Sequence, residues 1–343
     1  MLTQAGVLLL AAAVGRVWAA DPAPFGLLAL GAVAVVSGVA VGQSLNRTPT
    51  GFCRAAPNAT ADVCGPDALV RAVGTFANPN LLAAFLLLAL PLAVAGSAAL
   101  ADRGSRLVGT LVVVTGYVAI VCSGSRAAVA AALVGGLVVV ICRGGAARRV
   151  GLLIATAVLV VVLGGLALAG AGSVGIRGDV WAAAAGAVHD HPFGVGIGRA
   201  GAVITAGMSG TVMDHAHNLW LNWLVEAGYP GLVAVLVLTT AAAVGVVRAV
   251  RNGSRFATAI GAGLAGFATM SLVDHPANSQ RIALALRLVL GLLATVDTGT
   301  STISDDRPGA GPEKGRGPSL HSGRSGRTAR HRPTTRGRVM TWT

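Results

Sequence analysis

Apolar segments of near-constant length alternate with short polar segments along most of the chain. An apolar run of about 18 residues or more is long enough to cross the hydrocarbon core of a bilayer. No alternating β-barrel pattern is present, so the pattern predicts an all-α integral membrane protein, a polytopic helical bundle of about 8–9 transmembrane helices with a long extracytoplasmic loop. We expect the spans at residues 2–20, 25–43, 80–101, 107–122, 127–142, 150–170, 231–247, 256–273 and 281–296. A separate amphipathic helix is expected at 218–227, ending at Gly228.

The polar segments divide the chain into regions. Membrane spans occupy 1–43, 80–170 and 218–296, extracytoplasmic loops occupy 44–79 and 171–217, and a disordered, basic cytoplasmic tail occupies 297–343. Segments 102–106, 143–149, 248–255 and the tail carry the excess of Lys and Arg, which the positive-inside rule places in the cytoplasm. The loop 171–217, Arg126 and His275 then share the outer face. We therefore expect a multi-pass protein of the cytoplasmic (inner or plasma) membrane, with its polar site on the extracytoplasmic side.

Composition agrees with this membrane assignment. Hydrophobic residues make up 54% of the chain and charged residues 11%, against about 25% charged residues in soluble domains. Aromatic residues are only 4%, so the helices are expected to pack through Ala and Gly. The formal charge of +13 lies mainly in short loops and the tail. Membrane topology explains this charge, and nucleic-acid binding is not indicated.

Four cysteines are present. Cys53 and Cys64 lie in one polar loop, and a disulfide between them fits an extracytoplasmic location; the alternative is two free thiols. Cys122 and Cys142 fall at the ends of apolar segments and are expected to be packed thiols.

The segment 176–231 contains most of the reactive side chains outside the tail. Arg177 and Trp181 are four residues apart and share a face if the segment is helical. Arg177 then presents its planar fork to a phosphate while Trp181 stacks on a sugar; the alternative is a pair of interfacial anchors. Arg126 follows Ser123-Gly124-Ser125 at the outer end of a span. A charge beside hydrocarbon indicates function, and the alternative is an arginine that reaches to the headgroups.

His215, His217 and Asn218 precede an apolar helical run. Two histidines at i and i+2 lie on different sides of a helix and face together only in extended backbone. No HExxH or paired CxxC motif accompanies them, so no metal site is predicted. One imidazole at the edge of a dry pocket suits a general base, and the alternative is a helix-capping histidine. Asn78 or Asn80 is expected to cap the helix that begins near Pro79.

Five motifs together resemble a known family. In chain order they are FANPNLLAAFLLLALPLA, SGSRAAVAAALVGG around Arg126, Arg177 and Trp181 followed by HDHPFGVGIG, HAHNLWLNWLVEAGYPG, and SLVDHPANSQ. The ordered set is similar to the O-antigen ligase and O-antigen polymerase superfamily over about residues 70–296. This chain is shorter than typical members, which have additional spans.

The resemblance implies a membrane glycosyltransferase that uses a polyprenyl-linked donor. Members move a glycan from a polyprenyl (undecaprenyl-type) diphosphate carrier to an acceptor hydroxyl at the outer face. The partners implied are this donor, a glycan or cell-envelope acceptor and membrane lipids, with no nucleic acid and no cofactor. Arg126 and Arg177 match the diphosphate-contacting arginines and His217 matches the essential histidine, while His215, Asn218, Trp181 and Asn80 are candidate substrate-binding residues. We expect a metal-independent, inverting transfer; the alternatives are a polymerase of lipid-linked repeat units and a non-catalytic polytopic protein or transporter.

Overall fold

The computed structural model describes residues 23–54, 69–143, 175–208 and 212–296, together with residue 13. Several predicted features lie outside the described residues: the spans at 2–20 and 150–170, the basic segment 144–149, Cys64 and the tail at 297–343.

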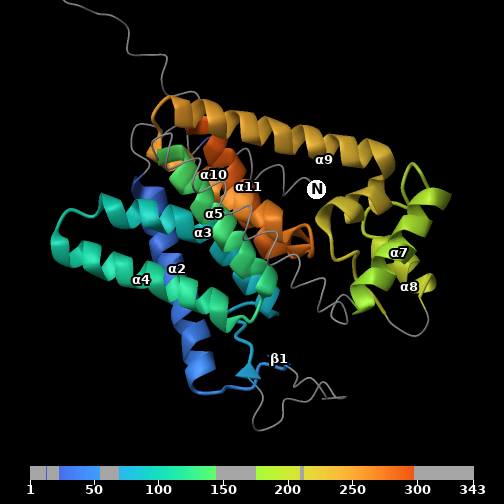
Figure 1. The fold of residues 1–343 in the computed structure, drawn as a ribbon, viewed down its shortest axis with the longest axis horizontal. Helices are drawn as coiled ribbons and strands as arrows, with labels where there is room; N and C mark the ends of the chain where they lie inside the picture. Colours follow the sequence, from blue (N-terminus) through green and yellow to red (C-terminus); the bar gives the residue numbers. More distant parts are fainter. Residues whose placement is uncertain (1–12, 14–22, 55–68, 144–174, 209–211, 297–343) are drawn as a thin grey trace, which may run out of the picture. The chain divides into compact units, whose positions relative to one another are not determined.

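The described residues are mainly helical (Figure 1). The helices are α2 (Ala23–Leu45), α3 (Pro79–Ala99), α4 (Arg103–Cys122), α5 (Arg126–Arg143), α7 (Gly175–Asp190), α8 (Ala200–Ala206), α9 (Leu219–Arg251), α10 (Arg255–Met270) and α11 (Gln280–Val296), with a short 3-10 helix η2 (Pro276–Asn278). Strands β1 (Cys53–Arg54) and β2 (Leu69–Val70) form a short antiparallel ladder. Five helices, α2, α3, α4, α5 and α9, are long and apolar enough to cross a membrane. The prediction of a helical, multi-pass class is therefore confirmed, and the full number of spans stays a prediction.

The sequence places the helix starts through side-chain caps. The Asn78 Oδ1 atom accepts a hydrogen bond from the Leu81 backbone N–H at 2.9 Å, and Pro79 occupies the first turn of α3. Asp102 caps α4 and Ser254 caps α10 in the same way. These caps satisfy backbone N–H groups that have no partner inside the helix. Of the two predicted caps for α3, Asn78 is the one used.

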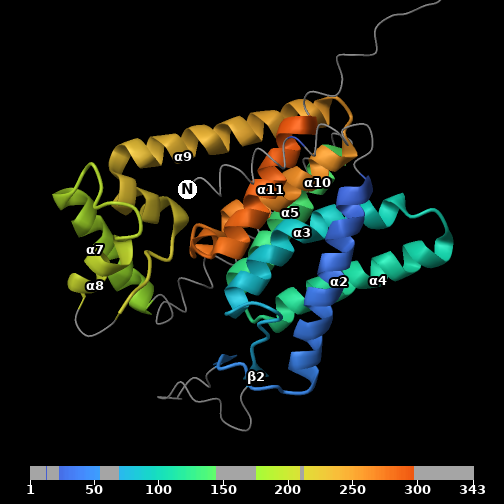
Figure 2. The ribbon, with the colours of Figure 1, turned by 180° about the vertical axis from the view of Figure 1, so that it is seen from behind.

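Small residues allow the helices to approach closely, as the composition predicted. Gly26 of α2 and Gly96 of α3 meet at the crossing of these helices, which Figure 2 shows from behind. A Cβ atom added to Gly26 would lie 2.7 Å from the Gly96 Cα atom, a distance too short for any side chain. Larger buried side chains such as Leu82, Leu86 and Ile260 fill the core between the helices. Close backbone approach gives the van der Waals contact that holds helices together in lipid.

Helices α5 and α10 pack antiparallel. Gly135 lies against the Ala262 carbonyl, and Gly266 lies against the Ala131 carbonyl. This register places Arg126, at the start of α5, at the same end of the bundle as Met270, at the end of α10. The opposite end carries Arg143 and Arg255. We refer to the end that holds Arg126 and Met270 as the site end.

A second apolar cluster joins α7, α8 and the first turns of α9, and includes Val180, Ile204 and Val225. The predicted loop 171–217 therefore contains two helices. As predicted, the chain breaks helical geometry at Gly228, where φ is 64° and ψ is −163°. The Gly194 Cα lies so close to the Glu226 carbonyl that an added Cβ would be 2.4 Å from its oxygen. The Gly-rich run after α7 thus shapes the backbone for packing against α9.

The cysteines agree with the prediction as far as they are described. Cys53, in β1, is disulfide-bonded, and Cys122 and Cys142 are free thiols. Because Cys64 lies outside the described residues, its pairing with Cys53 stays a prediction.

Candidate functional site

The segment from His215 to Asn218, which precedes α9, is held by several hydrogen bonds. The Trp181 Nε1 atom of α7 donates to the Ala216 carbonyl at 3.0 Å. The Ala216 N–H donates to the Asn222 Oδ1 atom at 3.1 Å, and Asn222 is only 3% exposed. Trp181, predicted to stack on a sugar or anchor at the interface, therefore uses its polar atom to position the histidine segment.

The same segment is docked on the end of α10. Asn218 is the N-cap of α9, with its Oδ1 atom accepting from the Leu221 N–H at 3.0 Å. Its Nδ2 atom donates to the Leu272 carbonyl at 2.8 Å, and the Leu219 N–H donates to the Ser271 carbonyl at 3.0 Å. The cap of α9 is thus Asn218 and not a histidine. These bonds fix the segment at the site end of the bundle, where Arg126 also lies.

His217 has an unusual backbone conformation, with φ of 48°. Few non-glycine residues occupy this left-handed region, and those that do often mark functional sites. Because both histidines precede the helix, their i,i+2 spacing does not separate them as it would within α9. The ring centroids of His215 and His217 are 4.5 Å apart.

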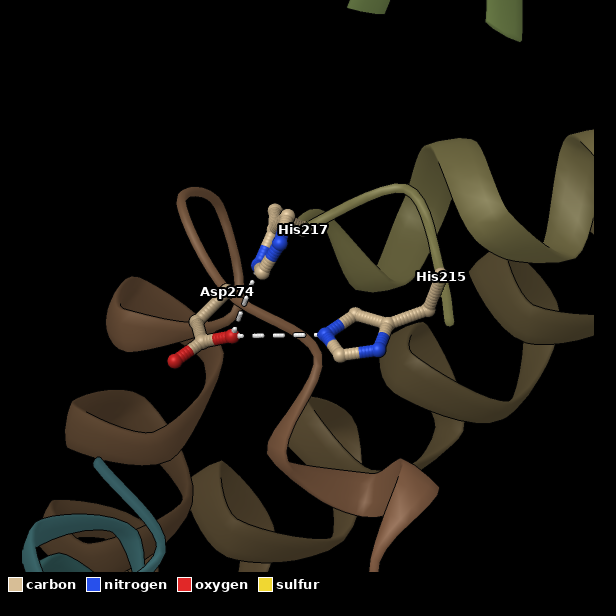
Figure 3. A group of neighbouring side chains, drawn as sticks. All are labelled: His215, His217 and Asp274. Carbon is tan, nitrogen blue, oxygen red and sulfur yellow. Dashed lines mark ion pairs between the residues drawn. The ribbon is translucent and has the colours of Figure 1, made fainter. Parts of the chain in front are cut away.

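Asp274 completes this group from the turn between α10 and α11 (Figure 3). Its Oδ1 atom lies 3.8 Å from the His215 Nε2 atom and 3.6 Å from the His217 Nδ1 atom. Asp274 is 7% exposed. Sequence reasoning missed this residue, although it lies in the SLVDHPANSQ motif. The available signal was the expectation that this turn and the histidines share one face.

The environment favours a charged carboxylate at Asp274. Burial alone would raise the pKa of this carboxyl, but the imidazoles of His215 and His217 and the His275 backbone N–H lower it well below its usual range. The His275 N–H donates to the Asp274 Oδ1 atom at 2.8 Å. The pKa of the His275 side chain is also lowered, to about 4, by burial and by the neighbouring His215. For an imidazole a lowered pKa favours the neutral form. At neutral pH the site therefore contains an anionic Asp274 beside a neutral His275.

The arginine candidate Arg126 begins α5 and is exposed. The preceding Ser125 caps the helix, with its Oγ atom 3.4 Å from the Ala128 N–H. Arg71, which sequence reasoning missed, reaches the same motif. Its Nε atom donates to the Ser123 carbonyl at 2.8 Å and its Nη2 atom donates to the Asn80 Oδ1 atom at 3.2 Å. Asn80 thus contacts Arg71, and the site end gains a second guanidinium beside Arg126.

Arg177 lies in the first turn of α7 and is half-buried. The segment is helical, as predicted, so Arg177 and Trp181 share one helix face. The Trp181 side chain is directed towards the histidine segment, because it bonds to Ala216. The structure therefore brings His215, His217 and Asn218 together with Trp181, and it puts Arg126 and Asn80 at the same end of the bundle.

The His215, His217 and Asp274 side chains also have the composition of a metal-ligand set. Their ligand atoms all lie within 4.8 Å of one another. The sequence predicted no metal site because no HExxH or paired CxxC motif accompanies the two histidines, but Asp274 adds a third group from a distant segment.

The fold and the site together define a multi-pass helical membrane protein whose reactive polar groups gather at one end of its bundle. Residues 111–236 match the family described as O-antigen ligase, and this match supports the resemblance seen in the motifs. The matched segment includes Arg126, Arg177 and His217, whereas Asp274 lies beyond it. Proteins of this family are membrane enzymes of the ligase and polymerase type. No curated protein matches the chain.

Proposed function

We propose that this protein is a glycosyltransferase that moves a glycan from a polyprenyl diphosphate carrier to an acceptor hydroxyl at the outer face of the cytoplasmic membrane. His217 is the general base of the transfer and Asp274 is the residue that positions it. Arg126 and Arg177 bind the diphosphate. The reaction inverts the anomeric centre and needs no metal ion.

The observation that carries this proposal is the pairing of His217 with Asp274. The Asp274 carboxylate lies 3.6 Å from the His217 Nδ1 atom, which leaves Nε2 as the ring nitrogen free to accept a proton. An anionic carboxylate on the far side of an imidazole stabilises the imidazolium that forms when the other ring nitrogen takes up a proton. The left-handed backbone at His217 and the bonds to Ala216 and Asn218 fix the backbone that carries this imidazole.

The guanidinium groups account for the leaving group. Departure of a lipid diphosphate develops negative charge on phosphate oxygens, and planar guanidinium groups neutralise it through paired hydrogen bonds. Arg126 is exposed at the site end, and Arg177 shares its helix face with Trp181. Arg71 lies beside the Arg126 motif, where its Nε atom donates to the Ser123 carbonyl.

The proposed step is a single displacement. The acceptor oxygen forms a bond to the anomeric carbon, and its proton passes to the His217 Nε2 atom. The bond between the anomeric carbon and the phosphate oxygen breaks, and its electron pair leaves with the carrier diphosphate. Attack from the side opposite the leaving group inverts the anomeric centre.

The test is glycan transfer by purified protein from a polyprenyl diphosphate-linked glycan to an added acceptor. General-base catalysis contributes about 10²–10⁴-fold, so His217→Ala is expected to lower the rate by that factor. His189→Ala is the matched control, because His189 is exposed at the end of α7 and should leave the rate unchanged. Transfer by His217→Ala at the wild-type rate would refute the base assignment.

The arginine clamp has its own variant. Arg177→Lys keeps the positive charge but loses the planar fork, so it is expected to lose most activity. Full activity in Arg177→Lys would show that Arg177 does not bind the diphosphate in this way. The products also distinguish two reactions: transfer to a different acceptor indicates a ligase, and one lengthening lipid-linked chain indicates a polymerase.

A further inference from the structure

The spacing within the His215, His217 and Asp274 group is not that of a hydrogen-bonded triad. Charge-assisted N–H···O bonds are about 2.7–2.9 Å long, whereas the two histidine nitrogens lie 3.8 Å and 3.6 Å from the carboxylate oxygen. Both approach the same oxygen, as Figure 3 shows. The buried His217 Nδ1 atom has no hydrogen-bond partner among the described residues. A buried nitrogen aimed at a carboxylate beyond bonding distance leaves room for a bound group between them.

These distances are close to those between ligands of one tetrahedral ion. Zinc lies about 2.0–2.1 Å from histidine nitrogen and about 2.0–2.2 Å from carboxylate oxygen, so two such ligands are separated by about 3.3–3.5 Å. The three ligand atoms here lie within 4.8 Å of one another. Small side-chain rotations therefore suffice to close the group around an ion. We propose that His215, His217 and Asp274 form a binding site for Zn²⁺ or a divalent ion of the same class.

The ligand types select this class of ion. Two imidazoles and one carboxylate are the donors of three-ligand zinc sites, which keep a fourth position open. Magnesium and calcium prefer sites built mainly from oxygen atoms. The backbone that carries the ligands is already fixed, because Trp181 and Asn222 hold Ala216 between the two histidines. A fixed backbone lowers the cost of ordering the ligands when an ion binds.

The surrounding residues resemble the outer shell of a metal site. The His215 Nδ1 atom lies 3.4 Å from the Asn278 Nδ2 atom. Rotation of this amide by a half-turn brings Oδ1 to that position, where it accepts a hydrogen bond from Nδ1–H. Histidines that bind metal through one nitrogen usually donate the other N–H to such an oxygen. On the carboxylate, the His275 N–H fixes Oδ1 by a 2.8 Å bond.

Occupancy of this site opposes glycan transfer, a consequence that rests on the proposed function. An ion on the His217 Nδ1 atom leaves Nε2 as an N–H group, which cannot accept the proton of the acceptor hydroxyl. The ion also neutralises the Asp274 carboxylate, which then no longer stabilises a charged imidazolium. The site is therefore inhibitory, and a metal-free protein is the active form.

The binding test uses the untagged full-length protein in detergent, stripped with EDTA and titrated with ZnCl₂ against a fluorescent chelator. We expect one more Zn²⁺ bound per wild-type chain than per chain of the His215→Ala and Asp274→Asn variants. The other histidines of the chain, including His321 and His331 in the tail, are common to all the proteins compared. His189→Ala should bind as wild type does, and Asn278→Ala should bind about 10–100-fold more weakly.

His215→Gln, which keeps a polar side chain of similar length, provides a second variant in case His215→Ala does not fold. Equal zinc binding by wild type, His215→Gln and Asp274→Asn would overturn the site. X-ray absorption of the 1:1 complex should show nitrogen and oxygen ligands only, and sulfur ligation would overturn it as well.

Activity separates this inference from the proposed function. We expect the stripped protein to transfer glycan and Zn²⁺ to inhibit it, with His215→Gln less sensitive. If the stripped protein is inactive and Zn²⁺ restores its transfer activity, the inhibitory role of the site is refuted. If His217-dependent transfer is found without zinc binding, the metal site fails and the proposed function stands. If zinc binds at the site but His217→Ala transfers normally, the proposed function fails and the site stands.

Discussion

Asp274 is the residue on which the proposed base most depends. It is 7% exposed, and its Oδ1 atom faces both His215 and His217. Asp274→Asn keeps the shape of the side chain but removes its charge. We expect the transfer rate to fall by about 10²–10⁴-fold, because the imidazolium loses the carboxylate that stabilises its charged form. Initial rates measured with saturating donor and acceptor check this expectation.

The control for Asp274→Asn is Asp214→Asn, which makes the same chemical change at an exposed position nearby. It should keep the wild-type rate. A purely structural role for Asp274 would lower the yield of folded protein but leave the pH profile of the remaining activity unchanged. We expect the profile to shift, and an unchanged profile would contradict the pairing.

His275 gives the fold a pH dependence. Its pKa is lowered from 6.5 to about 4 by burial and by the neighbouring His215. As the pH falls, the imidazole in the unfolded chain takes up a proton before the one in the folded protein does. The free energy of unfolding is therefore unaffected by this group above about pH 6.5, and it decreases between about pH 6.5 and 4. At pH 5 the loss amounts to about 2 kcal/mol relative to neutral pH.

His275→Gln removes the titrating group. Denaturant unfolding of the EDTA-treated protein at pH 7 and pH 5 should therefore show a smaller difference for the variant than for wild type. His191→Gln, at an exposed position, is the matched control and should retain the full difference. Equal pH dependence in His275→Gln and wild type would show that His275 is not the group responsible.

At this scale the sequence predicts single residues better than their partners. The local pattern indicated Asn78 as a cap, which the structure confirms, whereas the family resemblance indicated His217 as the essential histidine, and that role stays a prediction. Asp274 and Arg71 were missed because their roles arise only when distant segments meet. Spacing was also misleading for His215 and His217, since the helix rule applies only inside a helix, and both residues precede α9.

Among the elements, the crossing of α2 and α3 depends on two glycines. Gly26→Ala places a Cβ atom 2.7 Å from the Gly96 backbone, which forces the helices apart. Overpacking of this kind costs about 1–3 kcal/mol. Gly31→Ala is a matched change in the same helix, where an added Cβ meets no atom within 4 Å. We expect it to be neutral or to stabilise by about 0.5–1 kcal/mol.

Thermal unfolding of the two variants in the same detergent measures this difference. Gly26→Ala should unfold at a lower temperature than wild type, and Gly31→Ala should not. Equal unfolding temperatures for the two variants would contradict the close crossing. The composition predicted packing through small residues, but it could not identify which glycines meet, because every α-helix that the structure describes contains at least one glycine.

Over the whole molecule, the pattern of apolar segments predicted most of the helices that the structure describes. The spans expected at 25–43, 127–142 and 281–296 correspond to α2, α5 and α11 with small shifts at their ends. The expected loop 171–217 was less accurate, because the Ala-rich α7 is helical without being long enough to attract notice as a span. Its position beside α9 depends on apolar contacts of Val180 and Ile204, which no local pattern reveals.

The two ends of the bundle should face opposite sides of the membrane. The turn between α9 and α10 is basic, with Arg251 and Arg255, and lies at the end opposite Arg126. Basic loops stay in the cytoplasm, so a cysteine at Asn252, which is exposed in this turn, should be cytoplasmic. A cysteine at Asp214, which is exposed before α9, should lie outside. Both cysteine substitutions are made in a protein in which Cys122 and Cys142 have been changed to Ser. These two residues are the free thiols of the described residues.

A membrane-impermeant maleimide applied to intact spheroplasts should label Asp214→Cys and spare Asn252→Cys. Permeabilised membranes provide the control, because both variants should then react. Labelling of Asn252→Cys alone in intact spheroplasts would invert the orientation and place the site end in the cytoplasm, where a donor presented at the outer face cannot reach His217. Labelling of both from outside would contradict the division of the bundle into two ends. The expected pattern follows from one physical asymmetry: the arginine-rich turns gather at the end of the helices that lacks the histidine and aspartate side chains of the proposed site.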